Sequence, residues 1–141
     1  MKTKIYCSIA VALGLAALAV SQTAGSPKHH VVFQMSEAEG DTWGTVIAHV
    51  NNLRTAFAKD GGSQVEIVFF GEGIEMLHKT STKYEARLKK LTEDGVTLAA
   101  CQNAMRRHNL KSEDLFPFAT EVDSGVAEVA RKQEAGWAYI H

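Results

Sequence analysis

Cysteine is scarce in this sequence, and neither sign of charge dominates it. The 141 residues include only Cys7 and Cys101, which are too few for a disulfide-stabilised scaffold. With 15 Lys and Arg against 16 Asp and Glu, the formal net charge of -1 gives no indication of a nucleic-acid partner. A hydrophobic content of 45% and a charged content of 22% are typical of one ordinary globular domain, and they exclude collagen-like and low-complexity classes.

Three familiar site patterns are also missing. The sequence has no Cys-x-x-Cys motif, which excludes a self-contained thioredoxin-like redox cycle. The six histidines show no spacing typical of metal ligands, so we predict no metal site. The segment Gly71-Glu72-Gly73 lacks the glycine pattern and the following lysine of a phosphate-binding loop, which favours a simple turn after a strand.

The first 24 residues have the layout of a secretory signal peptide. Lys2 and Lys4 precede an apolar run over residues 5–20, and small and polar residues follow that run. We expect cleavage after Ala19 or Ala24, and either cleavage removes Cys7. The expected product is an exported protein, periplasmic or secreted, with one domain over residues 25–141 and no remaining membrane segment.

Short apolar strands alternate with helices along the rest of the chain. Almost continuous apolar runs predict strands at residues 31–35, 65–70, 96–100, 116–122 and 137–140. Apolar residues three and four apart predict helices from residue 41 to 60, from 82 to 94 and from 124 to 135, each followed by glycine. Shorter helical segments are predicted at residues 74–78 and 102–108.

Two of these helices carry signals for their first turn. Thr82 and Glu85 have the spacing of a capping box, and Ser124 can cap the last helix. In that last helix, Val126, Val129 and Ala130 are predicted to face the core.

The alternation of strand and helix predicts an α/β fold in which a parallel sheet lies between two layers of helices. The strand ends that lead into helices then share one edge of the sheet, where open sheets of this kind bind ligands and react. Cys101, the segment Gln34 to Ser36 and the segment Gly71 to Gly73 are all expected at this edge.

Cys101 is the candidate reactive residue. It follows a predicted strand and precedes a predicted helix, where free N–H groups and the helix dipole favour a thiolate. Arg106 and Arg107 would add positive potential, whereas Glu72 could oppose thiolate formation or accept a proton. His108 lies two helical turns further on, too far along the axis for direct contact with the sulfur. The alternative is a buried, inert thiol, because free cysteine is among the most buried residue types.

Several segments of the chain resemble the DsrE/DsrF-like family. They are Ala100-Cys101-Gln102-Asn103-Ala104-Met105, Glu113-Asp114-Leu115, residues 122–129 and residues 133–140, and the similarity extends over residues 30–141. The resemblance implies a three-layer α/β/α, Rossmann/flavodoxin-like fold with a parallel five-stranded sheet, assembled as homotrimers or hexamers. It also implies that Cys101 carries sulfane sulfur as a persulfide, without a cofactor, and that Asn103 shapes the loop.

Two features depart from that family pattern. Ala104 stands where relatives often have Ser or Thr, so one hydroxyl donor near the sulfur is missing. The better-understood carriers are cytoplasmic and work with partner subunits, whereas this chain is predicted to be exported.

Two functions remain open at this point. The first is a sulfur-handling protein in which Cys101 accepts sulfane sulfur and passes it to a thiol-bearing partner protein, whether or not it turns over as an enzyme. The alternative is a non-enzymatic, oligomeric small-molecule-binding module in which Cys101 only lines the pocket; an interchain disulfide is a third interpretation. The residues predicted to surround Cys101 at the site are Asn103, Gln102, Glu72, Gly71, Gly73 and Gln34.

Overall fold

The computed structural model describes residues 26–141, so the predicted signal peptide lies outside the described residues. The strands are β1 (His29–Met35), β2 (Ser63–Phe69), β3 (Thr97–Cys101), β4 (Thr120–Val122) and β5 (Ala138–Ile140). The α-helices are α1 (Asp41–Phe57), α2 (Thr82–Glu93), α3 (Gln102–Arg107) and α4 (Gly125–Glu134). Three 3₁₀ segments connect them, η1 (Ala58–Asp60), η2 (Gly71–Leu77) and η3 (Ser112–Asp114). Within residues 26–141, no helix has the length and apolar character needed to span a membrane.

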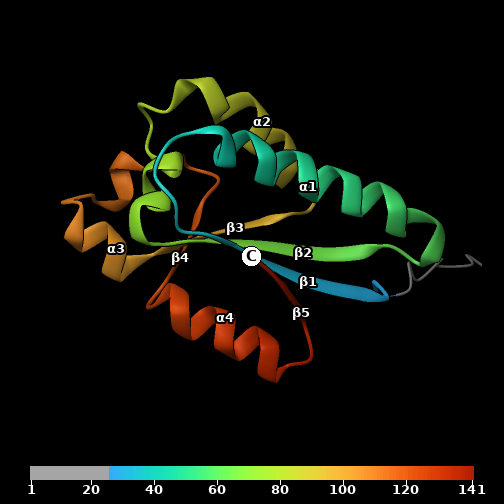
Figure 1. The fold of residues 1–141 in the computed structure, drawn as a ribbon. Coiled ribbons are helices and arrows are strands. Elements are labelled where there is room, and N and C mark those ends of the chain that lie inside the picture. The colour runs from blue at the N-terminus through green and yellow to red at the C-terminus, as the bar shows by residue number, and fades with distance from the viewer. Residues whose placement is uncertain (1–25) are drawn as a thin grey trace, which may run out of the picture.

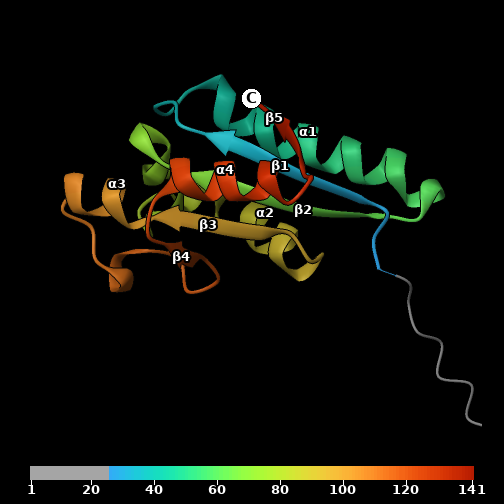
Figure 2. The same cartoon turned by 90° about the horizontal axis from the view of Figure 1, so that it is seen from below.

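The five strands form one parallel sheet in the order β4-β3-β2-β1-β5. Helices α1 and α2 cover one face of the sheet and α4 covers the other, as Figures 1 and 2 show from two directions. The predicted α/β/α fold with a parallel five-stranded sheet is therefore confirmed. The two edge strands, β4 and β5, are only three residues long.

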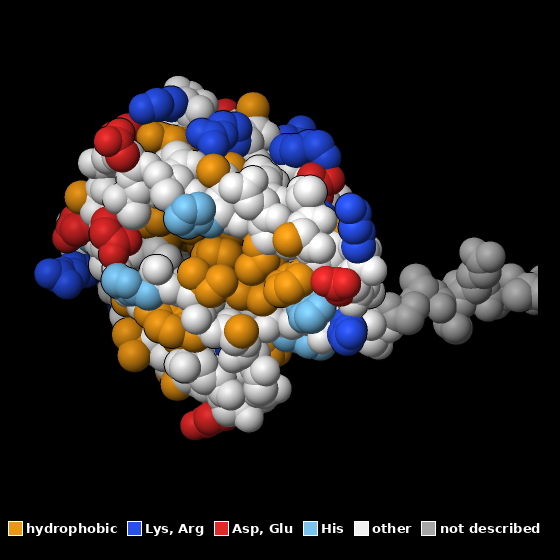
Figure 3. Space-filling model, turned by 45° about the vertical axis from the view of Figure 1, so that its right-hand side comes forward, with side chains coloured by type: hydrophobic (Ala, Val, Ile, Leu, Met, Phe, Trp, Pro, Cys, Tyr) orange, Lys and Arg blue, Asp and Glu red, His pale blue; other side chains and the backbone are white. Residues whose placement is uncertain are grey.

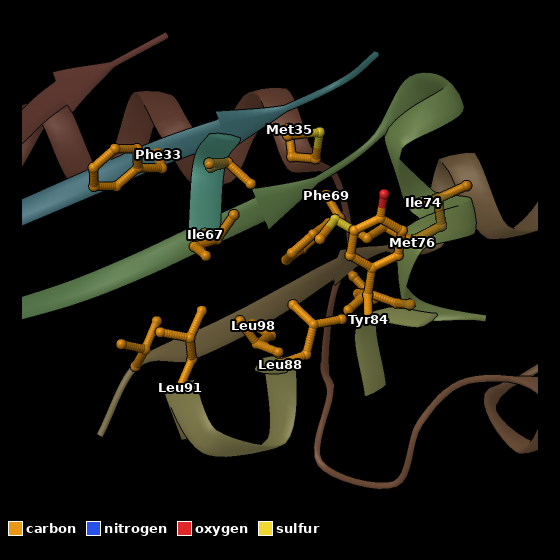
Figure 4. Packing of buried hydrophobic residues seen from close by; sticks show 14 of the residues in the cluster. Phe33, Met35, Ile67, Phe69, Ile74, Met76, Tyr84, Leu88, Leu91 and Leu98 are labelled. Atoms are coloured by element: carbon orange, nitrogen blue, oxygen red, sulfur yellow. The ribbon is translucent and has the colours of Figure 1, made fainter. Parts of the chain in front are cut away.

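The larger core lies between the sheet and helices α1 and α2. Both helices bury residues spaced three and four apart, which places them on one side of each helix. Figure 4 shows part of this cluster, in which Tyr84, Leu88 and Leu91 from α2 pack with Phe33, Ile67 and Leu98 from three neighbouring strands. Burial of each such aliphatic or aromatic side chain contributes roughly 1.5–3 kcal/mol, so this layer supplies most of the stabilisation.

The opposite face of the sheet has a smaller apolar cluster and a buried ion pair. Its fully buried members are Val32, Val68, Ala99 and Val129. Glu66 on β2, only 5% exposed, meets Lys132 of α4, whose Nζ atom lies 2.7 Å from Oε2 of Glu66. In the described part of the chain, this face is therefore covered by α4 alone, and the Glu66–Lys132 ion pair lies between that helix and the sheet.

Two predictions about helix starts need correction. Helix α2 begins at Thr82 and has Ser81 as its N-cap residue, with no side-chain cap. The Ser81 hydroxyl donates instead to the carbonyl of Glu75 over 2.7 Å, so the predicted Thr82–Glu85 capping box does not form. In α4, the prediction that Val126 and Ala130 face the core is wrong: Val126 is 66% exposed and Ala130 is exposed as well, so that of the three predicted residues Val129 makes the buried contact.

The Ser124 cap of α4 is confirmed. Its Oγ accepts the backbone N–H of Ala127 at 3.4 Å. One of the four N–H groups left free at a helix start is thereby satisfied, which fixes where α4 begins.

The fourth strand is shorter than the apolar run predicts. Residues 116–119 do not pair in the sheet, and the Ala119 N–H donates to the carbonyl of Phe116 in a turn. The ring of Phe116 is buried and stacks on Phe118, with 5.2 Å between ring centroids. The apolar character of this segment therefore reflects burial of aromatic rings and not strand pairing.

The loops at the carboxyl edge of the sheet are bonded to one another. The carbonyl of Ser36 accepts the N–H groups of Glu72 and Gly73 at 3.1 and 3.2 Å. A Cβ atom on Gly73 would lie 2.3 Å from the carbonyl oxygen of Met35, so only glycine allows this approach. The end of β1 and segment η2 thus form one rigid rim beside Cys101.

Candidate functional site

Cys101 is both the last residue of β3 and the N-cap residue of α3. Its Sγ accepts the backbone N–H of Ala104 at 3.4 Å, a cap that serine or asparagine usually supplies. The strand holds the residue in register through its pairing with Val122 of β4. An N–H dipole is therefore aimed at the sulfur, as the sequence predicts, and such a dipole stabilises negative charge on that atom.

The Cys101 residue is only 4% exposed, yet it lines a cavity of about 210 Å³. The cavity lies between the end of β2, the first turns of α3 and the start of α4; its lining residues are Phe70, Gly71, Cys101, Asn103, Ala104, Arg107, Ser124 and Val126. Sites for drug-sized ligands are usually about 300 Å³ or larger. This volume therefore suits a ligand of a few heavy atoms.

Close backbone approaches give the cavity its shape. Gly71 has a φ of +55° and lies against the Ser36 carbonyl, a combination that favours glycine. A Cβ atom on Gly125 would lie 2.9 Å from side-chain atoms of Phe70, so glycine also allows α4 to pack this closely on the end of β2. The cavity wall that faces α3 thus owes its shape to the close packing of two glycines, Gly71 and Gly125.

A bidentate ion pair stabilises the start of α4. Arg131 donates to both carboxylate oxygens of Asp123, at 2.9 and 2.8 Å. These bonds lower the pKa of Asp123 to about 2. The pair links the turn after β4 to the second turn of α4, and it holds Ser124 and Val126 at the cavity wall.

Two of the predicted binding residues lie with Cys101 in the cavity, namely Gly71 and Asn103. The Asn103 side-chain oxygen accepts a hydrogen bond from the guanidinium of Arg106. Arg106 is therefore engaged by its own helix, whereas Arg107 lines the cavity.

The other four predicted binding residues lie outside the cavity lining. Gln102 donates from its side-chain amide to Glu121 at 3.0 Å, and this bond and one from Ser112 lower the pKa of Glu121. Gln34 accepts a hydrogen bond from the Tyr139 hydroxyl at 2.6 Å. Gly73 packs on β1 as described above.

Glu72, the fourth, faces His108 instead of the sulfur. Its Oε2 lies 3.7 Å from Nε2 of His108, while Nδ1 of the same ring lies 2.8 Å from Oε1 of Glu75. Glu72 lines a separate cavity of about 400 Å³ near Trp43 and Tyr84. Neither Glu72 nor His108 is therefore among the residues that line the Cys101 cavity.

Nothing in residues 26–141 brings three or more His, Cys, Asp or Glu side chains together in a way that could hold a metal ion. The chemistry of this site therefore has to be considered in terms of the thiol, the amide and the guanidinium that line the cavity.

Comparison with known proteins identifies the family of the chain. A family model described as the DsrE/DsrF-like family matches residues 6–141. The chain belongs to this family. Members of the DsrE/DsrF-like family are generally linked to sulfur metabolism and sulfur transfer.

Among solved structures, this DsrE/DsrF-like chain is similar to a protein of unknown function from Methanobacterium thermoautotrophicum. The two are 30% identical, with a TM-score of 0.75, and the match covers 79% of this chain and 97% of that one. No curated protein matches the chain.

Five cavity residues of this DsrE/DsrF-like chain are not among the predicted binding residues: Phe70, Ala104, Arg107, Ser124 and Val126. Arg107 was considered only with Arg106 as a source of positive potential, and Ser124 only as a cap. The sequence signal that could have identified Ser124 and Val126 is their place just after β4, since that strand neighbours β3 and ends at the same edge.

Proposed function

We propose that this protein carries sulfane sulfur on Cys101 as a persulfide and passes it to an acceptor thiol. The observation that carries the proposal is the position of Cys101, a residue that lines a small cavity and whose sulfur accepts a hydrogen bond from the Ala104 N–H. Membership in the DsrE/DsrF-like family supports the same chemistry.

The transfer requires no cofactor and no external oxidant. The Cys101 thiolate attacks a sulfane sulfur of the donor, a new S–S bond forms, and the donor's S–S bond breaks with its electron pair leaving on the departing fragment. An acceptor thiolate then attacks the outer sulfur of the persulfide, and the Cys101 thiolate leaves. Each step conserves electrons, because one S–S bond replaces another.

The low exposure of Cys101 fits a carrier, because a covered persulfide is protected from other thiols until an acceptor reaches the cavity. A water molecule occupies about 30 Å³ in the liquid, which sets the scale for one small added group. The cavity volume of about 210 Å³ therefore accommodates an added sulfur atom. A thiol sealed without any cavity would instead support the inert alternative.

We propose that the protein acts outside the cytoplasm, as the predicted signal peptide over residues 1–24 indicates. Its acceptor is then a thiol-bearing protein of that compartment. Mass analysis of the protein recovered from the exported fraction of its host checks this, because cleavage predicts a chain that begins after Ala19 or Ala24.

The experiment that tests the carrier function is a loading and hand-over assay on the purified protein. A Cys7→Ser variant keeps Cys101 as the only thiol, and a Cys7→Ser/Cys101→Ser variant is the matched control. We expect polysulfide to load the first variant and not the second, and a small acceptor thiol to remove the added sulfur from the loaded protein.

Three results separate the alternatives. Loading without hand-over would favour a storage thiol over a carrier. Failure of loading, with ligand binding intact in a Cys101→Ala variant, would favour the binding module. A dimer band on non-reducing electrophoresis that disappears in Cys101→Ser would favour the interchain disulfide.

A further inference from the structure

Among the described residues that line the Cys101 cavity, the only charged side chain is a cation. Of its eight lining residues, Arg107 is the only one with a charged side chain, and no carboxylate is among them. Arg107 is exposed, and within residues 26–141 its guanidinium forms no ion pair or side-chain hydrogen bond. Its positive charge is therefore available to whatever enters the cavity.

The carboxylates nearest to the cavity in the fold already have partners. Asp123, directly before Ser124, is paired with Arg131, and Glu121 accepts from Gln102. Glu72, directly after Gly71, faces His108. None of the three lines the cavity, so the charge of Arg107 is not matched by an acidic group in its lining.

We infer that Arg107 makes this cavity selective for small anionic sulfur donors, such as polysulfide or thiosulfate, over neutral ones, and that it positions them for attack by Cys101. This inference rests on the proposed function and names its substrate class. A guanidinium remains charged at every relevant pH and donates several hydrogen bonds, which suits a compact anion.

Both donors give a balanced step. With thiosulfate, the Cys101 thiolate attacks the outer sulfur, and sulfite leaves with the electron pair of the broken S–S bond. With polysulfide, the thiolate takes one sulfur, and a polysulfide dianion shorter by one sulfur leaves. In each case the leaving group is also a dianion, so a cation beside the cavity stabilises both the entering and the departing charge.

The test compares two alkylating reagents that differ mainly in charge. Iodoacetate is an anion and iodoacetamide is neutral, and both react with the thiolate. The ratio of their rates at Cys101 is therefore insensitive to the amount of thiolate, and it reports how the cavity treats negative charge. All measurements use the Cys7→Ser background.

Three variants are compared with the Cys7→Ser background for this rate ratio. Arg107→Gln removes the charge in the cavity, and Arg107→Lys keeps it. Arg106→Gln is the matched control, because it removes the same charge from the next residue, which does not line the cavity. We expect Arg107→Gln to lower the iodoacetate preference about 3- to 10-fold, as for two unit charges about 4 Å apart in water, because Arg107 is exposed. Arg106→Gln should lower it less than about twofold, and Arg107→Lys should retain most of it.

The preference should also weaken in high salt, because the screening length falls to about 3 Å at 1 M ionic strength. Persulfide loading rates of wild type and Arg107→Gln with polysulfide and with thiosulfate then identify the donor: the one whose loading falls with the loss of Arg107 is the one that the cavity recognises.

The outcomes distinguish this inference from the proposed function. An unchanged rate ratio in Arg107→Gln, or an equal fall in Arg106→Gln, overturns the role of Arg107, while persulfide formation on Cys101 leaves the carrier function standing. If neither reagent labels Cys101 in the folded protein, the proposed function fails, and the inference that rests on it fails with it.

Discussion

At the scale of the residue, Cys101 is buried and yet lines a cavity. Only 4% of the residue is exposed, but Cys101 is among the residues that line the cavity where α3 and α4 begin. A small reagent can therefore reach this thiol through the cavity, and an acceptor protein has to present its own thiol at the cavity. The same argument explains why the backbone N–H of Ala104 matters: it interacts with the sulfur from inside, where no solvent competes for it.

Glu66 is a residue whose charge works against the folded state. Burial raises the pKa of this carboxyl above its ordinary value of 4.5, although the ammonium of Lys132 opposes the shift. One of its oxygens, Oε1, has no hydrogen-bond partner within the described residues. Ionisation of Glu66 is therefore less favourable in the folded protein than in the unfolded chain.

The sign of the resulting pH dependence follows from this raised pKa. Below pH 4.5 the group is protonated in both states and has no effect on stability. As the pH rises above 4.5, the unfolded chain loses its proton first, so the free energy of unfolding decreases until the folded pKa is passed. We predict that Glu66→Gln removes this decrease, so the variant gains stability relative to wild type between pH 4 and pH 7.

Denaturant unfolding of both proteins across that pH range measures the difference. Lys132 keeps a carboxylate in the variant, because Glu128 lies 3.6 Å from its Nζ atom. A variant that loses stability relative to wild type as the pH rises would contradict the prediction, since it would mean that the ion pair outweighs burial.

At this scale the sequence predicts the reactive residue but few of its neighbours. Cys101 follows from the strand-to-helix position, Gly71 follows from the shared sheet edge, and Asn103 follows from the family resemblance. Glu72 and Gln34 share that edge too, but Glu72 faces His108, and Gln34 accepts a hydrogen bond from Tyr139, 105 residues further along the chain. The spacing of residues along the chain does not predict side-chain contacts between segments that lie so far apart in the sequence.

At the scale of the element, segment η2 depends on a glycine that packs against backbone. We predict that Gly73→Ala lowers the free energy of unfolding by about 3 kcal/mol, because its Cβ would overlap the Met35 carbonyl oxygen and force the rim apart. Loading of Cys101 should slow as well, since η2 begins at Gly71 in the cavity wall.

The matched control for this substitution is Gly44→Ala in helix α1. The nearest heavy atom to a Cβ at that position is the end of the Arg87 side chain at 3.7 Å, an ordinary contact. This variant should gain about 0.5–1 kcal/mol from the better helix propensity of alanine. Denaturant unfolding of the two variants beside wild type tests both signs, and a Gly73→Ala protein as stable as wild type would contradict the steric argument.

Most elements could be predicted because their signals are local. The apolar spacing of α1 and the continuous run of β2 required no tertiary information. Two of the misplaced features, the start of β4 and the direction of Val126, depend on what packs nearby. Phe116 and Phe118 stack on each other and not in a strand, and α4 has space on one side, where nothing in residues 26–141 covers Val126.

At the scale of the whole molecule, the two faces of the sheet are covered unequally. Within residues 26–141, the exposed large hydrophobic side chains are Val126 and Tyr139. Figure 3 shows hydrophobic side chains gathered on one side of the surface, with histidines around them. Exposed apolar patches of this kind mark interaction sites in soluble proteins.

We predict that the protein is a homotrimer or homohexamer in solution, as its resemblance to the family implies. Light scattering coupled to size-exclusion chromatography measures this directly, and the expected mass is about three or six times that of one chain. A monomeric mass over the working concentration range would contradict the prediction, and it would leave the exposed patch for a different partner.

The parallel sheet and its layers could be predicted because strand and helix alternate from residue 29 to the end of the chain. The position of Arg107 in the cavity lining could not be predicted, because it depends on how the ends of α3 and α4 lie relative to each other. The close contacts of Gly125 with Phe70 and of Gly71 with Ser36, which shape the same cavity, also appear only in three dimensions.

The measurement that tests the account most directly is peptide mass analysis of the purified protein after brief exposure to polysulfide, with new thiols and persulfides trapped by iodoacetamide. We expect the alkylated peptide that contains Cys101 to be heavier by about 32 Da, one sulfur atom, than the same alkylated peptide from untreated protein. An unmodified Cys101 peptide from the folded protein, or an adduct that persists in Cys101→Ser, would contradict it.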